Sequence, residues 1–495
     1  MILPSQTRVG AFLSSDKTIT KGLEKENLRA NSFAEISDKS YPKSLGSHHF
    51  NNYVTLDYSE PHLELITPTF ENNDDLYNFL SQLHFYVQQN LDGDYLWNYS
   101  MPPIFKEDLI TLPKAGVTNK SKLAYLYRLG LRNRYGDKMQ STAGIHFNIS
   151  FSETYLKNLA EEKNQFYLGV ARNFLRLFPI ALRLTGCSPV THCSFLKGRD
   201  LHVEQIGENN CYLPKATSLR VSRLGYYSEE QEKNFIDFNS LDGYLDIMRE
   251  YINKPNKKFS NIPSSTPDYQ QVNTGTIQME SELYNHIRPK AKQPNLRQFI
   301  QLENSGIDYL EIRSIDLNPF SDIGVSANDL LFWEAFTFYC AICESPEINA
   351  IEAEIIKENI RRASERGQDC NLITSYEDAK SEASIKTITN EFLNTLEQVL
   401  NKSQINENFD EMIVELKRRN EKPLSERVIE EILACDGIIN FVKTKSLPIE
   451  IEIDSELQEL FMQESLESLK KFDDHLSKDK IGFDEFLKNF RGETK

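Results

Sequence analysis

Apolar residues follow two different spacings along this chain. Up to about residue 345, helical stretches alternate with short segments in which every second residue is apolar. In 74–90 and 164–184 the apolar residues recur three and four positions apart, which predicts packed amphipathic helices. After residue 345 nearly every segment is rich in charge and keeps the helical spacing. We therefore expect a mixed core over 1–345 and a helical region over 346–495 that packs on it, both in one structural unit.

The alternating segments carry acidic side chains on one face. Alternation predicts strands over 22–29, 62–68, 144–151, 276–284 and 309–315, several of them with an apolar opposite face. For any single strand, the simplest interpretation is a sheet face in water. A sheet face in water usually includes lysines, but these polar faces hold almost none. The side chains on them, or beside them in 57–60, are Glu24, Glu26, Asp57, Glu60, His62, Glu64, His146, Asn148, Gln278, Glu280, Glu282, Glu311 and Arg313.

Taken together, these faces indicate a cation site. Neighbouring carboxylates on one strand face lie about 7 Å apart and repel by about 2 to 3 kcal/mol at an effective dielectric near 20. About six such acids around one cavity would cost roughly the whole 5 to 15 kcal/mol stability of a fold. Oxygen-rich ligands with at most one histidine favour Mg²⁺ or Mn²⁺ over zinc. Two carboxylates about 7 Å apart on one strand face can flank two metal ions roughly 3.5 to 4 Å apart, the spacing found in enzymes of phosphoryl transfer.

Basic residues on the same segments could hold phosphates. The chain has no GxxxxGK[ST] motif, no GxGxxG leading from a strand into a helix and no HExxH. If ATP binds, metals and arginines must therefore hold its phosphates. Each candidate alone is also compatible with an ordinary surface salt bridge, although one of them, Arg313, shares its strand face with Glu311. The candidates are Arg128, Arg220, Arg288 and Arg313.

Composition and charge narrow the class of partner. The 495 residues are 39% hydrophobic and 11% aromatic, enough to bury a large core. A formal net charge of -17 argues against nucleic acid or an anionic membrane as a partner, because both require a basic surface. Small molecules and metals are therefore the expected partners.

The ends, the apolar runs and the cysteines indicate a cytoplasmic protein. The first residues lack a secretory signal pattern, and no window approaches eighteen consecutive apolar residues. The seven cysteines, an odd number, favour reduced thiols over a disulfide framework. Cys340 and Cys343 form a CxxC inside an apolar helical stretch, where we expect core residues rather than a redox or zinc pair.

Seven segments between residues 22 and 325 resemble a known family in order and spacing. They read GLEKENLR, LGSHHFNNYVTLDYSEPHLELITP, YRLGLRNRYG, MQSTAGIHFNIS, CYLPKATSLRVSRLGYY, IQMESELYNHIRPK and GIDYLEIRSIDLNPFSDIGV. The series is similar to glutamate–cysteine ligases of the gamma-proteobacterial type, which catalyse the first step of glutathione synthesis. The C-terminal 150 residues match only as a helical region. Tyr58 follows Asp57 where relatives often have phenylalanine.

The resemblance implies a fold and a reaction. The fold is of the α+β class, with a curved six-stranded antiparallel sheet like that of glutamine synthetase, walled by helices and set around three divalent cations. The implied reaction is ATP-dependent: the γ-carboxylate of L-glutamate becomes γ-glutamyl phosphate, and the amine of L-cysteine then displaces phosphate. Arginines and ions must neutralise the charge that develops during phosphoryl transfer.

The resemblance also assigns roles to residues that match the family's motifs. Arg313 and Arg128 are expected at the transferring phosphates, and Arg288 at the nucleotide. The implied Mg²⁺ or Mn²⁺ ligands are Glu24, Glu26, Asp57, Glu64, His146 and Glu311. The implied substrate-binding residues are Arg220, Tyr226, Tyr284, Tyr127, Tyr58, Gln140 and Asn148.

Two other interpretations stay open from the sequence. A ligase with the same fold could use ammonia or another amine, and the acceptor pocket would decide between them. An acidic metal-buffering or scaffold protein would bind partners through the helical C-terminal region and would not turn over ATP. Relatives make glutathione a candidate feedback inhibitor.

Overall fold

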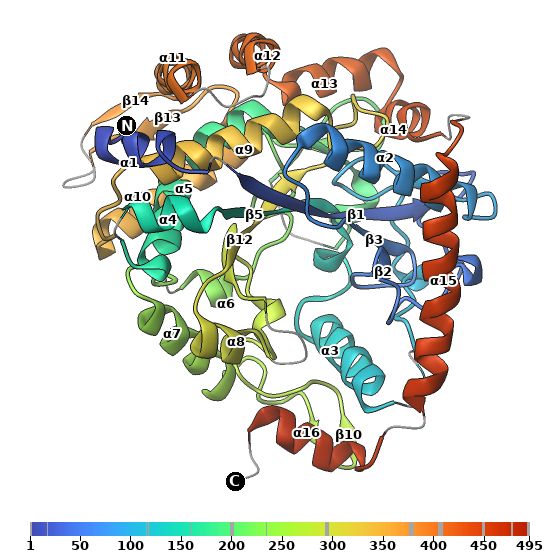
Figure 1. Ribbon diagram of the computed structural model, residues 1–495. Helices are drawn as coiled ribbons and strands as arrows, with labels where there is room; N and C mark the ends of the chain where they lie inside the picture. Colours follow the sequence, from blue (N-terminus) through green and yellow to red (C-terminus); the bar gives the residue numbers. More distant parts are fainter. Residues whose placement is uncertain are drawn as a thin grey trace.

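The computed structural model describes residues 2–16, 18–114, 116, 118–159, 161–198, 202–233, 235–292, 297–375, 381–403, 409–447, 451–476 and 479–492. Its central feature is a seven-stranded sheet in which every strand pairing is antiparallel (Figure 1). Six strands follow one another in the order β11-β12-β5-β1-β3-β2, and β4 also pairs with β1. The strands are β1 Ile19–Ala30, β2 Val54–Leu56, β3 His62–Ile66, β4 Tyr95–Trp97, β5 Gly144–Phe151, β11 Ile287–Lys290 and β12 Tyr309–Asp316.

The strand count differs from the six expected. β5 pairs with the first part of β1, up to Lys25, and β4 takes up the same edge of β1 from Leu28 onward. Because β1 has 12 residues, it is long enough to carry two successive partners on one side. Four of the predicted strands are confirmed as β1, β3, β5 and β12.

The strand predicted over 276–284 is wrong. This segment is irregular and contains only the short 3-10 helix Glu280–Glu282. The Glu282 carboxylate accepts the backbone N–H of Gln278 at 2.8 Å and pairs with Arg134 at 2.9 Å. These side-chain bonds replace the backbone ladder that a strand would need, so the alternation of polar and apolar residues here does not produce one.

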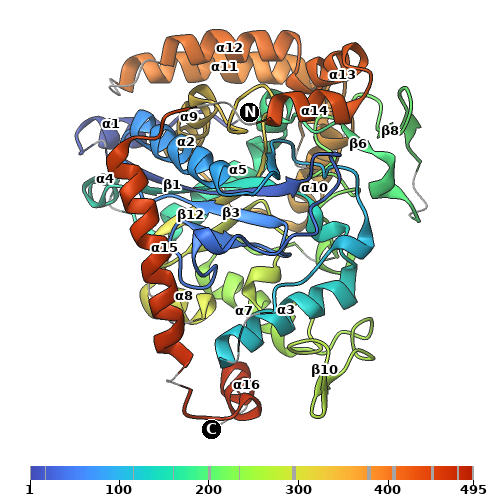
Figure 2. The ribbon, with the colours of Figure 1, turned by 90° about the vertical axis from the view of Figure 1, so that its right-hand side faces the viewer.

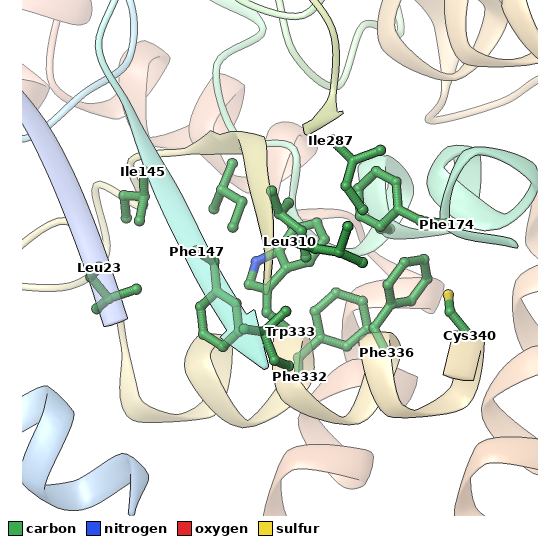
Figure 3. Close-up of a cluster of buried hydrophobic side chains, with 14 of the residues drawn as sticks. Leu23, Ile145, Phe147, Phe174, Ile287, Leu310, Phe332, Trp333, Phe336 and Cys340 are labelled. Carbon is green, nitrogen blue, oxygen red and sulfur yellow. The ribbon is translucent and has the colours of Figure 1, made fainter. Parts of the chain in front are cut away.

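One face of the sheet is largely apolar and packs on two helices. α5 (Lys163–Thr185) and α9 (Ala327–Ile342) lie against it, and Leu23, Phe147 and Leu310 meet Phe332 and Phe336 there (Figure 3). These side chains are almost fully buried and form the core of the molecule. The opposite face carries the predicted acids of β1, β3 and β12.

Helices enclose this core, as the apolar spacing predicted. α2 and α5 correspond to the helices expected over 74–90 and 164–184. None of the helices among the described residues combines the length and the apolar character needed to cross a bilayer. The helices not yet bounded are α1 Gln6–Leu13, α2 Asn73–Gln89, α3 Asn119–Tyr135, α4 Glu153–Leu159, α6 Glu229–Glu232, α7 Leu241–Asn253, α8 Gln298–Ser305 and α10 Ala350–Arg366.

The C-terminal region is helical and lies over several parts of the core. α10 packs on α5, α12 on α9, α15 on α2 and α16 on α3. α15 runs along one edge of the molecule, and α16 lies at the end of the molecule that carries α3 and β10 (Figures 1 and 2). Its other helices are α11 Ile385–Ser403, α12 Phe409–Glu421, α13 Leu424–Ala434, α14 Ile438–Ser446, α15 Ser455–Leu476 and α16 Phe483–Arg491. The boundary at residue 345 stays a prediction.

The cysteines correct one expectation. Cys193 and Cys211 form a disulfide, whereas reduced thiols were expected throughout. The two residues are 18 positions apart, and the antiparallel pairing of β6 (Val190–His192) with β8 (Asn210–Tyr212) brings them together. Cys340 and Cys343 are buried free thiols in the core, as predicted. The remaining short strands are β7 Glu204–Gln205, β9 Ser264–Ser265, β10 Asp268–Tyr269, β13 Asn371–Ile373 and β14 Glu382–Ser384.

Candidate active site

Strand register gathers the predicted acids on the polar face of the sheet. Glu24 of β1 lies opposite His146 of β5, and Glu26 lies opposite Glu64 of β3. Glu311 of β12 lies opposite Asn148 of β5. Because directly opposed residues in an antiparallel pair point to the same face, these side chains share one side of the sheet.

His146 forms the centre of the acid cluster. Its Nδ1 is 3.0 Å from Glu24 Oε2, and its Nε2 is 3.2 Å from Glu26 Oε1. Burial and the charge of Arg313 oppose protonation of His146, but the hydrogen bonds to the two carboxylates outweigh them and raise its pKa to about 9. Burial also opposes the charge on Glu24, and the bond with His146 nevertheless lowers the pKa of that carboxyl. The imidazolium is thus an internal counter-ion for both acids.

Glu64 is the acid whose charge is least compensated. Burial raises its pKa well above the ordinary value, and the charges of Glu24 and Asp57 raise it further. Within the described ranges no salt bridge reaches the Glu64 carboxylate. One ligand atom from each of Glu24, Glu64 and His146 lies within 4.8 Å of the others. Two carboxylates and one imidazole that converge in this way suit a hard divalent cation.

Glu311 differs, because three cations surround it. Arg313, Lys290 and Arg288 place guanidinium or ammonium nitrogens 3.1, 3.3 and 3.8 Å from its carboxylate. Burial opposes the charge on Glu311, yet Lys290 and the two arginines lower its pKa well below the ordinary value. These nitrogens form a cationic cluster next to the acids.

A bulge in β12 sets the direction of Arg313. The register of β12 against β5 shifts between Ile312 and Ile315, so Arg313 and Ser314 together stand opposite His146. A bulge of this kind re-aims a side chain at the surface of a sheet. Arg313 thereby lies beside both Glu311 and His146.

Sequence reasoning missed Lys290. It follows Arg288 by two positions on β11, so both side chains lie on the face of Glu311. The signal was present in the segment IRPK, where the two basic residues alternate with apolar or proline positions.

The predicted Arg220 and Arg128 flank the acid cluster. Arg220 is buried, donates to the carbonyl oxygen of Arg313 at 3.2 Å and lies 3.8 Å from Glu26. A Cβ at Gly144 would come within 2.2 Å of the Arg220 guanidinium, so any other residue at the start of β5 would displace that guanidinium. Arg128 donates to the backbone carbonyls of Leu56 and Asp57 at 2.7 and 2.9 Å. Asp57 is itself partly exposed and lies 3.4 Å from His62.

The predicted tyrosines form a wall beside the cations. The rings of Tyr226 and Tyr284 meet edge to face at 4.4 Å, and Gln140 donates to the Tyr284 hydroxyl at 2.8 Å. Burial raises the pKa of Tyr127 well above its ordinary value, and the nearby charge of Glu282 raises it further, while Arg288 acts in the opposite direction. The wall therefore combines ring surface with hydroxyl groups.

Two predicted substrate residues have protein partners that sequence reasoning did not find. The hydroxyl of Tyr58 donates to Asp137, which also accepts from Arg132 at 2.8 Å. Asn148 donates to Glu24 at 3.1 Å and so lies within the acid cluster. Arg288, expected at the nucleotide, bonds the backbone of 281–283 as well as facing Glu311.

Comparison with known proteins gives a consistent result. The family model described as glutamate-cysteine ligase matches residues 11–363. The chain is 33% identical to the glutamate–cysteine ligase of Wigglesworthia glossinidia brevipalpis, over 87% of this chain and 90% of that one. It is 32% identical to the enzyme of that name from Alcanivorax borkumensis, over 89% of this chain and 90% of that one.

A solved structure gives the same picture. The glutamate–cysteine ligase of Francisella tularensis, crystallised in complex with AMP, is similar to this chain with a TM-score of 0.90. The two share 25% sequence identity, and the alignment covers 96% of this chain and 98% of that one.

Proposed function

The chain belongs to the glutamate–cysteine ligase family, and from this premise we propose that it joins the γ-carboxylate of L-glutamate to the amine of L-cysteine. ATP is the phosphoryl donor, and the products are γ-glutamylcysteine, ADP and phosphate. The observation that carries the proposal is the convergence of Glu24, Glu64 and His146 on one face of the sheet, beside the cationic cluster that Arg313 and Lys290 form around Glu311.

The reaction has two steps. An oxygen of the glutamate γ-carboxylate forms a bond to the γ-phosphorus of ATP as the bond to ADP breaks. The cysteine amine then forms a bond to the carbonyl carbon of the γ-glutamyl phosphate, the bond from that carbon to the phosphate oxygen breaks, phosphate leaves, and the amine loses a proton. Both steps bring several negative groups together, so the chain must supply fixed positive charge where charge develops.

The acid cluster fits Mg²⁺ or Mn²⁺. Glu24, Glu64 and His146 would hold the ion, with Glu26, Asp57 and Glu311 as further ligands. A bound ion of this kind neutralises phosphate oxygens during transfer. The support from the structure is the convergence of these donor atoms and, among the described side chains, the lack of an ion pair at Glu64. His146 would lose its proton on binding, because a ligand must present a free lone pair.

The cationic cluster would bind and orient the phosphates. Arg313 lies between Glu311 and His146, where it can contact the transferring group, while Lys290 and Arg288 stand next along the sheet. Arg128 would support the phosphates from the side of Asp57. We also assign the sheet to the glutamine synthetase type, since it likewise presents acids from several antiparallel strands.

The tyrosine wall would hold the acceptor. Tyr127, Tyr226 and Tyr284 bury a small amino acid while their hydroxyl groups reach its carboxylate. Arg220 would pair with a substrate carboxylate, which binds well to a buried guanidinium. Glutathione contains the product as a part of its structure, so it would compete for the same wall as a feedback inhibitor. The cytoplasm, where ATP is made and used, is the proposed location.

A single assay tests this function. ADP release should require both glutamate and cysteine, and γ-glutamylcysteine should accumulate in equal amount. If ADP is released as fast with ammonia or alanine as with cysteine, the result would favour a ligase that uses another amine as its acceptor. Absence of any substrate-dependent ADP release would leave the scaffold interpretation.

A further inference from the structure

Helix α16 packs on α3, in an apolar cluster that includes one residue of the tyrosine wall. Leu487 is fully buried against Leu123 and Leu126 of α3 and against Val272. Tyr127, one of the wall residues, belongs to the same apolar cluster. Figures 1 and 2 both place α16 next to α3, at the end of the molecule away from α11 and α12.

A chain of hydrogen bonds leads from α16 to Tyr127. Arg491 donates through Nε to the carbonyl oxygen of Val272 at 2.7 Å and through Nη2 to that of Ser264 at 2.6 Å. The N–H of Val272 in turn donates to Gln278 Oε1 at 2.9 Å. Gln278 Nε2 donates to the carbonyl oxygen of Tyr127 at 3.2 Å. Every residue in this chain of hydrogen bonds is buried or half-buried.

Gln278 is well placed to transmit a displacement. Its side chain is fully buried, and it lies so close to α3 that a Cβ at Gly130 would come within 2.0 Å of its Oε1. Its backbone N–H is held by Glu282, two residues before Tyr284. A shift of the 264–278 segment would therefore move Gln278 against the turn of α3 that carries Tyr127.

A second set of contacts fixes α16 in place. Arg297 donates to the carbonyl oxygen of Phe490 at 2.9 Å and stacks on the Phe490 ring at 4.5 Å. The same guanidinium pairs with Glu280 at 3.1 Å. Asp484 accepts from the hydroxyl of Tyr269 at 2.9 Å. The helix is thus docked on both sides of the segment that contains Gln278.

From this arrangement we propose that Arg491 of α16 is a positioning residue for the acceptor substrate and acts through Val272 and Gln278 on Tyr127. The inference rests on the proposed function, in which Tyr127 contacts the acceptor amino acid. Arg491 touches no substrate itself. It sets where the Tyr127 hydroxyl stands, and so it governs the KM for the acceptor more than the rate of phosphoryl transfer.

The test compares initial rates of ADP release by the full chain. Arg491→Ala should raise the KM for L-cysteine about fivefold to tenfold, as expected for the loss of one or two charge-assisted hydrogen bonds. The KM for ATP and the kcat should change less than about twofold. Arg491→Lys, which keeps the charge and one bond, should give an intermediate KM. Lys488→Ala, an exposed residue of the same helix, should match the parent chain.

A mutant cycle identifies the route. In a Tyr127→Phe background, which lacks the hydroxyl, Arg491→Ala should raise the cysteine KM by less than about twofold. Equal effects of Arg491→Ala in both backgrounds would overturn the proposed route. A parallel rise of all three substrate KM values with a lowered Tm would overturn it too, because that result means general loosening. If the parent chain shows no cysteine-dependent ADP release, it is the proposed function that fails.

Discussion

Strand β1 buries charged side chains on both of its faces. On the face toward the core, Lys21 pairs with Glu334 at 2.8 Å, and Arg29 lies 3.4 Å from Asp94. On the same face, Lys25 Nζ is 2.6 Å from His84 Nδ1. On the other face stand Glu24 and Glu26, which share one histidine.

The two faces differ in where their counter-charges come from. Lys21 and Arg29 have carboxylate partners of fixed position, and burial lowers the pKa of Lys25 well below its ordinary value, so that face needs little from solution. The site face collects acids from β1 and β3 and offers His146 to them, which leaves Glu64 without an ion pair among the described side chains. A buried charge without a partner is expensive, so on the proposed function a bound cation would stabilise the site face and not the core face.

The largest expected effect comes from removing an acid of the site face. Glu24→Ala should lower the rate of ADP release by about a thousandfold or more, since on the proposed function an ion ligand and the orientation of His146 are lost together. The same change should not lower the Tm measured in EDTA, because the repulsion on Glu64 falls. Glu71→Ala, at an exposed acid, serves as the control. Near-normal activity of Glu24→Ala would remove the acid cluster from the mechanism.

Removing a cation from the core face should act on stability instead. Lys21→Met removes the ion-pair partner of the Glu334 carboxylate, whose side chain is 5% exposed, and leaves it with the amide of Asn73 as a neutral donor. The free energy of unfolding should fall by about 3 to 5 kcal/mol, as for other broken buried pairs. Urea unfolding measures this loss, and Lys21→Met/Glu334→Leu should recover most of it. A loss below about 1 kcal/mol for the single change would mean that this pair is not a fixed counter-charge.

Added Mg²⁺ should stabilise the folded chain through the acids of the site face and not through the ion pairs of the core face. Mg²⁺ at about 100 times its Kd should raise the free energy of unfolding by about 2.7 kcal/mol if it binds only the folded chain. Thermal unfolding with and without Mg²⁺ measures the shift. Glu64→Gln should abolish it, whereas Lys21→Met should keep it despite its lower starting Tm. An equal shift in all three proteins would point to an ion site elsewhere.

Alternation of side chains was enough to predict which acids share a face, but not how they are compensated. Glu24, Glu26, Glu64 and Glu311 lie where a two-residue period puts them, because β1, β3 and β12 are regular at those positions. The segment 276–284 has the same alternation, yet Glu282 captures its backbone, and a pattern of polarity does not contain that contact.

The partners of the site come from distant segments. Lys290 reaches Glu311 through the pairing of β11 with β12, and Asp137 reaches Tyr58 across a sequence distance of 79 residues. The disulfide between Cys193 and Cys211 depends in the same way on a strand pairing. Such contacts are fixed by tertiary packing, which local propensity does not encode.

The smallest expected effect concerns protons on the core face. Burial and the charge of Lys25 hold the pKa of His84 well below its usual range. In the unfolded chain a histidine takes up a proton near pH 6.5, so the unfolded state binds more protons below that pH and the fold loses stability as pH falls. This contribution is complete above about pH 6.5 and declines by about 1.4 kcal/mol per pH unit below it. Urea unfolding measures the free energy of unfolding at each pH. Between pH 6.5 and 5 this free energy should fall less steeply for His84→Gln than for the parent chain, by about 1.4 kcal/mol per pH unit. Other histidines with lowered pKa, such as His286 at about 4, act in both proteins and cancel in the difference. Parallel stability curves for the two proteins would show that His84 is protonated in the fold and that Lys25 lacks the neutral partner on which the contrast between the two faces depends.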